Sequence, residues 1–321
     1  MLSRVADSLY WMTRNIERME NNARLVEVKL ISQLENANPI HNINQDWEEV
    51  LHISGFHGSF DNLYTRYNDR SVIDFLFFSK DNPSSILNSI NIVRENARAI
   101  REIIPQELWG NINSFYFNVK NYANYAWEMD QISDFCDMVK KESLLFHGIL
   151  DGTMLRGDAY LFMDIGKYLE RAEKSARILD VLYHKNLYGY PNEEVVAYHH
   201  WWSVLQSVSG YEAYIKTYRP LIVDRQVAEF FILNPDFPRS MFYCIQRVRE
   251  AFLTLEKGEV KEYNQQLAEE LEKFELDLKE TTIDQIVAVG AHNYLQQFLK
   301  RSNMIGNLVT STYYLGEITI P

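Results

Sequence analysis

Apolar residues recur with helical spacing along most of the chain. Over residues 2–34, Val5, Leu9, Met12 and Ile16 lie on one side of a helical wheel. Similar stretches run roughly over 47–66, 71–79, 84–103, 112–149, 155–184, 194–217, 224–233, 238–256, 259–277 and 284–314. No segment alternates apolar and polar residues between hairpin turns, as a half-buried strand would. The pattern therefore predicts an all-α fold.

Turn-forming clusters separate these stretches. Residues 81–84 and 234–238 combine Asn and Asp with Pro, which is typical of turns. Ser84 or Ser85, and Ser240, stand where a helix N-cap is expected. The chain has only 13 Gly and 8 Pro, so long helices are favoured.

The chain contains an internal duplication centred on the pattern Glu-Arg-x-Glu-x-x-Ala-Arg. Eight residues recur 153 positions later: Leu2, Ala6, Glu17, Arg18, Glu20, Ala23, Arg24 and Val28 correspond to Leu155, Ala159, Glu170, Arg171, Glu173, Ala176, Arg177 and Val181. A second set recurs 155 positions later, from Trp47 and Trp202 through Val93-Arg94-Glu95 and Val248-Arg249-Glu250. We expect a helical bundle of two pseudo-symmetric repeats of about 150 residues, over 1–150 and 151–321, packed as one body. The second repeat includes a C-terminal helix.

Each repeat places a glutamate inside an apolar stripe. Glu20 lies between Ile16 and Ala23 on the helical wheel, and Glu173 occupies the matching position of the second repeat. A buried carboxylate must be paired, because an isolated buried charge is costly. Arg24 and Arg177 follow at the favourable i to i+4 spacing, so we expect Glu20–Arg24 and Glu173–Arg177 pairs. If the two helices cross, Glu20 would also reach Arg177, and Glu173 would reach Arg24.

Three interpretations of this pattern stay open, one of which is a docking role at the protein surface. A buried Glu/Arg network that fixes helix register explains it without any ligand. Alternatively, the acids and arginines bind a small molecule, a metal or the end of a peptide, since Arg binds carboxylates in a bidentate manner. The candidate binding residues are Glu17, Arg18, Glu20, Arg24, Arg94, Glu95, Arg156, Glu170, Arg171, Glu173, Arg177, Arg249 and Glu250.

A di-metal centre and the common catalytic motifs are not indicated. Di-metal carboxylate bundles use Glu-x-x-His on two helices. This chain has one such spacing, Glu49 with His52, and the repeat positions are Val204 and Ser207. The sequence has no nucleophile elbow, phosphate loop or dinucleotide fingerprint. We expect no metal and no cofactor, and no catalytic residue is identified.

Net charge, cysteine spacing and hydropathy exclude several classes of binding partner for this protein. The formal net charge is -12, which disfavours nucleic-acid binding through phosphate contacts. The two cysteines, Cys136 and Cys244, have no metal-ligand spacing. The first residues lack the apolar core of a signal peptide, and no apolar stretch approaches the ~20 residues of a membrane span. We expect a cytoplasmic protein that binds neither nucleic acid nor membrane.

Several of these segments resemble the bacterial alpha-E domain family. The resemblance rests on residues 1–12, on Glu17-Arg18 and Ala23-Arg24, on 81–85, on 94–98 with 107–109, on Glu170-Arg171, and on 234–240. It covers nearly the whole chain. The family pattern commonly has Gly where this chain has Thr13, whereas the aligned position of the second repeat is Gly166.

The resemblance implies an all-helical protein without an assigned activity. Genes of this family typically neighbour those of a circularly permuted ATP-grasp protein and a transglutaminase-like protease. That context implies a non-catalytic accessory or binding protein of an ATP-dependent peptide or amide ligase, with the ligase, the transglutaminase-like protein or a peptide as partner. The alternative is an enzyme of peptide or amide chemistry that uses Glu17, Glu20, Glu170 and Glu173 as acid/base groups or metal ligands.

Overall fold

A computed structural model describes residues 1–35, 43–124, 127–189, 194–218 and 221–313. These residues contain helices and no strand, which confirms the all-α prediction. They form two compact units, and the division falls within one helix, between Lys167 and Tyr168.

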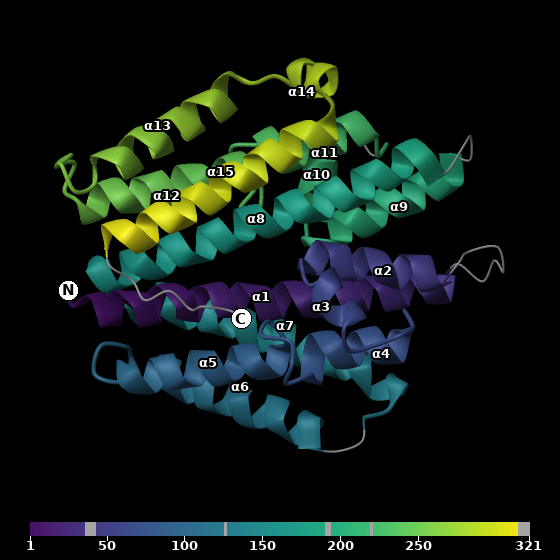
Figure 1. Cartoon of the computed structure of the whole chain (residues 1–321), viewed down its shortest axis with the longest axis horizontal. Coiled ribbons are helices and arrows are strands. Elements are labelled where there is room, and N and C mark those ends of the chain that lie inside the picture. Colours follow the sequence, from purple (N-terminus) through teal and green to yellow (C-terminus); the bar gives the residue numbers. More distant parts are fainter. Residues whose placement is uncertain (36–42, 125–126, 190–193, 219–220, 314–321) are drawn as a thin grey trace. The chain divides into compact units, whose positions relative to one another are not determined.

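The first unit, Met1–Lys167, is built around its N-terminal helix. Helix α1 packs against α5 and α7, and α6 packs against both of those helices (Figure 1). The elements are α1 (Ser3–Glu35), α2 (Ile43–Ser54), α3 (His57–Asp61), α4 (Asp69–Ile73), the π-helical turn η1 (Asp74–Phe78), α5 (Ile86–Ala99), α6 (Gln106–Asn124), α7 (Met129–Thr153) and the first part of α8 (Asp158–Gly189).

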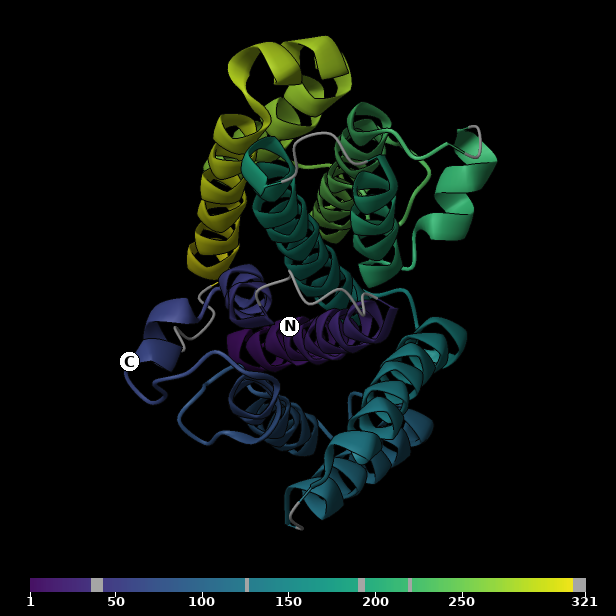
Figure 2. The same ribbon diagram turned by 90° about the vertical axis from the view of Figure 1, so that its right-hand side faces the viewer.

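The second unit begins at Tyr168 and contains the rest of α8. Helix α13 packs along α12 and α15, and α11 contacts α9, α12 and α14 (Figure 2). The further elements are α9 (Glu194–Ser207), α10 (Tyr211–Thr217), α11 (Asp224–Leu233), α12 (Met241–Leu255), α13 (Gln265–Glu280), α14 (Ile283–Val289) and α15 (Ala291–Thr312).

Several predicted helices are divided by residues with positive φ. Gly55 (φ 87°) separates α2 from α3, Ser209 (φ 50°) lies between α9 and α10, and Gly290 (φ 91°) separates α14 from α15. A left-handed residue cannot continue a right-handed helix. The apolar-periodic stretches over 47–66, 194–217 and 284–314 therefore each contain two helices. The stretch over 112–149 also contains two, because α6 ends at Asn124 and α7 begins at Met129.

The predicted N-caps are confirmed. The Ser85 hydroxyl accepts a hydrogen bond from the backbone N–H of Asn88 at 3.2 Å and begins α5. The Ser240 hydroxyl accepts one from the backbone N–H of Tyr243 at 3.1 Å and begins α12. Each cap satisfies a backbone donor that the helix itself leaves unpaired.

Helix α1 meets the first part of α8 at very close range. The hydroxyl of Thr13 donates a hydrogen bond to the backbone carbonyl of Met163 at 2.9 Å. Gly166 lies one turn further along α8, where a Cβ atom would be 2.4 Å from the carbonyl oxygen of Tyr10. The absence of a side chain at Gly166 therefore permits this approach.

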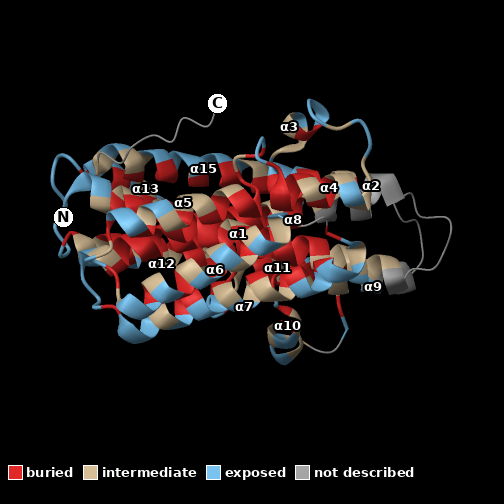
Figure 3. Ribbon diagram, turned by 90° about the horizontal axis from the view of Figure 1, so that it is seen from below, coloured by how far each residue is buried: buried red, intermediate tan, exposed pale blue. Residues whose placement is uncertain are grey.

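Buried residues follow the faces that the helices turn toward their neighbours (Figure 3). In α1, residues 12–17 and 19–26 are all buried, and they include charged side chains. No helix in the described ranges combines the length and apolar character that a membrane span needs.

Candidate functional site

The charged motif of α1 is buried. The side chains of Glu17 and Glu20 have a relative exposure of 0%, and Arg24 is 8% exposed. Arg18 is half-buried, and its guanidinium carbon lies 5.6 Å from the centre of the Trp11 ring. The prediction that Glu20 belongs to the inward-facing stripe of this helix is confirmed.

Glu20 and Arg24 form the predicted ion pair. The Nε and Nη2 atoms of Arg24 both donate to Oε1 of Glu20, at 2.8 and 2.6 Å. A helix places residues i and i+4 on one face, so the pairing follows directly from the sequence. The guanidinium compensates the charge of a fully buried carboxylate.

Helix α7 adds a histidine to this pair of acids. Nε2 of His147 lies 3.0 Å from Oε1 of Glu17, and His147 is itself only 8% exposed. Ligand atoms of Glu17, Glu20 and His147 all lie within 4.8 Å of one another. We call these three residues the buried acid–histidine group. Its chemistry allows proton exchange between the imidazole and a carboxylate, and it also matches a set of metal ligands.

A second ion pair joins α1 to α7. Nζ of Lys140 lies 2.6 Å from Oε2 of Glu27 and 2.9 Å from Oδ1 of Asp137. Burial alone would lower the pKa of Lys140, but the hydrogen bonds that its ammonium donates to Glu27 and Asp137 outweigh burial and raise the pKa. The Lys140 ammonium therefore stays charged and fixes the register of the two helices.

The second copy of the motif, on α8, is also buried. Glu170 is 1% exposed, and Arg171 and Glu173 are each 8% exposed. Nη1 of Arg171 donates to the backbone carbonyl of Pro238 at 3.4 Å, which ties α8 to the turn before α12. The arginine of this copy thus contacts a backbone oxygen of its own unit.

The predicted Glu173–Arg177 pair stays a prediction, although its spacing equals that of Glu20 and Arg24. Arg177 is only partly buried, whereas Arg24 is 8% exposed. A guanidinium that keeps contact with water gains little from an ion pair, so spacing alone does not enforce one. The reciprocal contacts expected between Glu20 and Arg177, and between Glu173 and Arg24, join the two units and stay a prediction.

The other candidate arginines lie at separate positions with partners of their own. In α5, Nε of Arg94 donates to Asn113 at 2.9 Å, and exposed Glu95 pairs with Arg98 at 2.6 Å. In the turn before α8, exposed Arg156 lies 3.3 Å from Asp151. In the described structure, neither Arg94 nor Arg156 contacts the buried acid–histidine group.

The two remaining candidates lie on α12. Nη1 of Arg249 lies 2.9 Å from Oε2 of Glu275 on α13, and Glu250 pairs with Arg247 at 2.7 Å. These ion pairs are partly exposed, and such pairs contribute little to stability. Arg249 therefore links neighbouring helices of the second unit.

Sequence reasoning did not identify His147 or Lys140. Both lie on α7, more than a hundred residues from the motif, and neither belongs to a recognisable spacing pattern. The available signal was their position on the face of α7 that also carries Val139, Phe146 and Leu150, all fully buried. A polar residue on such a face requires a partner.

Comparison with known proteins agrees with this architecture. A family model, Alpha-E, described as a predicted alpha-helical domain with a conserved ER motif, matches residues 1–314. The Glu-Arg pairs at Glu17-Arg18 and Glu170-Arg171 are the two instances of that dipeptide within the repeated motif. No curated relative and no solved structure shows a significant match to the chain. The all-helical fold and a match over nearly its whole length show that the chain belongs to the Alpha-E family.

Proposed function

We propose that this protein is a non-catalytic accessory or binding protein of a bacterial, cytoplasmic ATP-dependent peptide or amide ligase of the ATP-grasp type. The observation that supports this proposal is that most of the charged side chains of the repeated motif are buried. Glu20 has no exposed surface, and Arg24 binds it through two nitrogen atoms. Charged groups held in this way stabilise helix packing and are not presented to a substrate. The proposed partners are the ligase, a transglutaminase-like protein or a peptide undergoing modification.

We further propose that the chain is built from two pseudo-symmetric repeats. Equivalent hydrogen bonds support this architecture. The Asn22 amide donates to the backbone carbonyl of Ser84 at 3.2 Å, and the Ser175 hydroxyl donates to the carbonyl of Arg239 at 2.7 Å. Ser175 follows Asn22 by the 153-residue offset, and Arg239 follows Ser84 by the 155-residue offset. The repeat boundaries at 150 and 151 stay a prediction.

A second equivalence concerns the last helix of each repeat. Glu27 binds Lys140 of α7, and the residue 153 positions after Glu27, Asp180, binds His292 and Gln296 of α15, each at 2.7 Å. Matching carboxylates thus join the motif helix to a later helix in both units. The two repeats thus share these contacts between helices as well as the apolar pattern. This favours a structural, scaffold role for both repeats.

A surface near the N-terminal end of α1 suits a partner. Leu2 is 65% exposed and Leu155 is 88% exposed, and these leucines are equivalent in the two repeats. The amino group of Met1 lies 3.9 Å from Asp158, so both segments belong to one surface region. Exposed Arg4 and Arg156 flank the leucines. Apolar side chains beside arginines fit a peptide or an acidic protein surface.

The test is direct binding between this protein and the neighbouring ATP-grasp-type ligase. We expect the two purified proteins to co-elute and to bind at micromolar concentration. A Leu155→Asp, Arg156→Glu double variant should weaken binding at least tenfold. Leu276→Asp, a change at a 48% exposed leucine of α13, serves as the control. The absence of binding at tens of micromolar would contradict the proposal.

The buried acid–histidine group favours a second candidate function, an enzyme of peptide or amide chemistry. A carboxylate 3.0 Å from an imidazole is a common acid/base arrangement. For an enzyme, Glu17→Gln abolishes turnover of a peptide or amide substrate while the unfolding temperature is retained. For an accessory protein, the same change lowers the unfolding temperature, and the folded variant still binds the ligase.

A further inference from the structure

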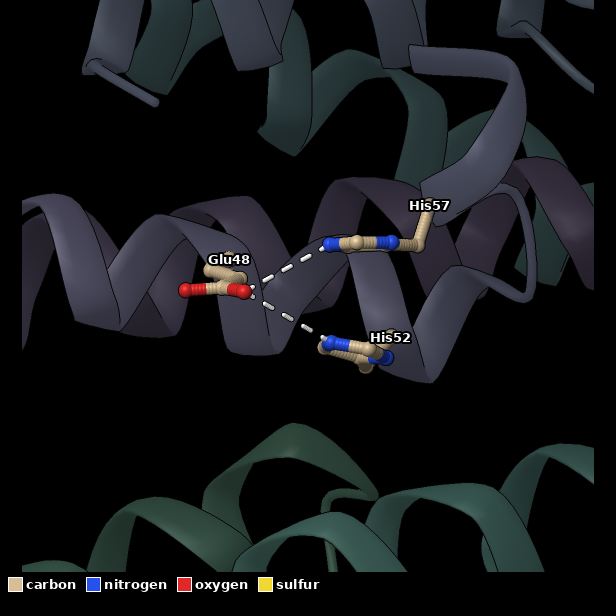
Figure 4. Close-up of side chains that lie close together, drawn as sticks. All are labelled: Glu48, His52 and His57. Atoms are coloured by element: carbon tan, nitrogen blue, oxygen red, sulfur yellow. Dashed lines mark ion pairs between the residues drawn. The ribbon is translucent and has the colours of Figure 1, made fainter. Parts of the chain in front are cut away.

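Two histidines and a glutamate come together on α2 and α3, outside the charged motif. Glu48 and His52 are four residues apart on one face of α2. Gly55, with a φ of 87°, then turns the chain so that His57 at the start of α3 returns toward His52. The two imidazole rings stack with centroids 4.1 Å apart and planes 14° apart (Figure 4). A residue with a side chain would be strained at Gly55, so this turn depends on glycine.

The three side chains bring their ligand atoms within 4.8 Å of one another. Oε1 of Glu48 lies 3.5 Å from Nε2 of His57 and 3.9 Å from Nε2 of His52 (Figure 4). Neighbouring ligand atoms around a tetrahedral zinc ion, with bonds of about 2.0 Å, are roughly 3.3 Å apart. The observed separations are somewhat longer, and the two stacked imidazole rings must also tilt so that their in-plane lone pairs converge on one ion. The side chains are 42%, 50% and 27% exposed for Glu48, His52 and His57, so solvent ions reach them.

Asp61 orients one of the histidines for this role. Its Oδ2 lies 3.4 Å from Nδ1 of His57, which leaves Nε2 facing Glu48. Metal-binding histidines characteristically donate their other ring N–H to a carboxylate in this way. Tyr67 lies 3.3 Å from Nε2 of His57, but its hydroxyl donates a hydrogen bond to Asp61. That bond, with burial as the next cause, raises the pKa of Tyr67 to about 12.

The surrounding structure holds α3 in place. Phe60 is 0% exposed and packs edge-on against Phe75, with ring centroids 5.3 Å apart. It also stacks against Tyr67 at 5.2 Å. Because this short helix is anchored by a buried aromatic residue, His57 and Asp61 are positioned before any ligand arrives.

We propose that Glu48, His52 and His57 bind a divalent first-row transition-metal ion of the Zn²⁺ type. Two imidazoles and one carboxylate favour such an ion over Mg²⁺ or Ca²⁺, which prefer oxygen ligands. Three protein ligands leave at least one coordination position for water or for an exogenous ligand, as in catalytic rather than structural zinc sites. The site uses Glu48, at the i to i+4 spacing, and not the Glu49–His52 pair of the sequence pattern. It is independent of the proposed ligase partnership.

The experiment is a titration of the full-length protein after chelator treatment and dialysis. Isothermal titration with ZnCl₂ should show one high-affinity ion per chain, MgCl₂ should show none, and Co²⁺ should give a visible absorption band. Glu48→Gln, His52→Ala and His57→Ala should each weaken Zn²⁺ binding at least about tenfold, and Asp61→Asn should weaken it by roughly tenfold. Glu49→Gln and His200→Ala, changes of the same residue types elsewhere, should leave the affinity unchanged.

Circular dichroism and unfolding temperature of the metal-free variants report whether each one folds. His52, whose ring is half exposed, supplies the decisive variant if His57→Ala fails to fold. Absence of a stoichiometric Zn²⁺ site in the wild type would overturn the proposal. Equal affinity in wild type and folded His52→Ala would overturn it as well.

Discussion

Gly166 of α8 lies against the backbone carbonyl oxygen of Tyr10 in α1, so closely that a Cβ atom on Gly166 would be 2.4 Å from that oxygen. The same Cβ would be 2.7 Å from the hydroxyl oxygen of Thr13. The family resemblance associates glycine with position 13 as well. Here one glycine, in α8, is sufficient for the close approach, and the Thr13 hydroxyl bonds across the contact to Met163.

Gly166→Ala should destabilise the protein strongly. The new methyl group meets backbone atoms, which cannot rotate away, so α1 and α8 must separate. We expect a loss of roughly 3 kcal/mol in the free energy of unfolding, at the upper end of overpacking effects. Urea unfolding measures it. Gly148→Ala in α7, where no atom lies within 4 Å, should instead stabilise by up to about 1 kcal/mol. Equal effects of the two changes would refute the explanation.

Thr13→Val should lower the free energy of unfolding by about 1 kcal/mol, the usual net contribution of a hydrogen bond. The change keeps the side-chain shape and removes the donor to Met163. Thr13→Ser, which retains the hydroxyl, is the control for this bond. If Thr13→Val loses no stability while Thr13→Ser does, packing of the methyl group, and not the hydrogen bond, stabilises this contact. Thermal and urea unfolding distinguish the outcomes.

Local signals made much of the fold predictable. Apolar periodicity located α1 within two residues, and Pro followed by Ser located the caps at Ser85 and Ser240. The breaks at Gly55, Ser209 and Gly290 were missed, because the apolar period continues across each of them. A single residue in the left-handed region ends a helix without changing the hydrophobic pattern around it.

The candidate sites were predictable only where they are local. The Glu20–Arg24 pair follows from i to i+4 spacing, whereas Glu17–His147 joins helices that are distant in the sequence. The group at Glu48, His52 and His57 depends on the direction in which the chain turns at Gly55. For Glu173 and Arg177 the spacing rule gives only a prediction, because it contains no information on whether the guanidinium is buried.

Glu20→Gln should cost far more stability than Glu95→Gln, although both glutamates pair at 2.6 Å with an arginine of the same helix, at i+4 for Glu20 and at i+3 for Glu95. Glu20 is fully buried, so the substitution breaks a buried ion pair by removing one of its charges, at about 3 to 5 kcal/mol. The Arg98–Glu95 pair is exposed, and its loss should cost less than about 1 kcal/mol. Unfolding free energies from urea titration provide the comparison. Similar losses would show that burial does not determine the strength of this pair.

Glu142→Gln should change how stability depends on pH. Burial raises the pKa of Glu142, against the opposing hydrogen bonds from Asn118 and Asn111 on α6. A carboxyl group whose pKa is higher in the folded state stabilises fully below its unfolded pKa of about 4.5, and this contribution is lost as the pH rises through the folded value. Relative to Glu142→Gln, the wild type should therefore lose unfolding free energy from pH 4.5 to 7. Asp134→Asn, at an exposed acid of α7, is the control. A pH-independent difference between wild type and Glu142→Gln would contradict the assignment.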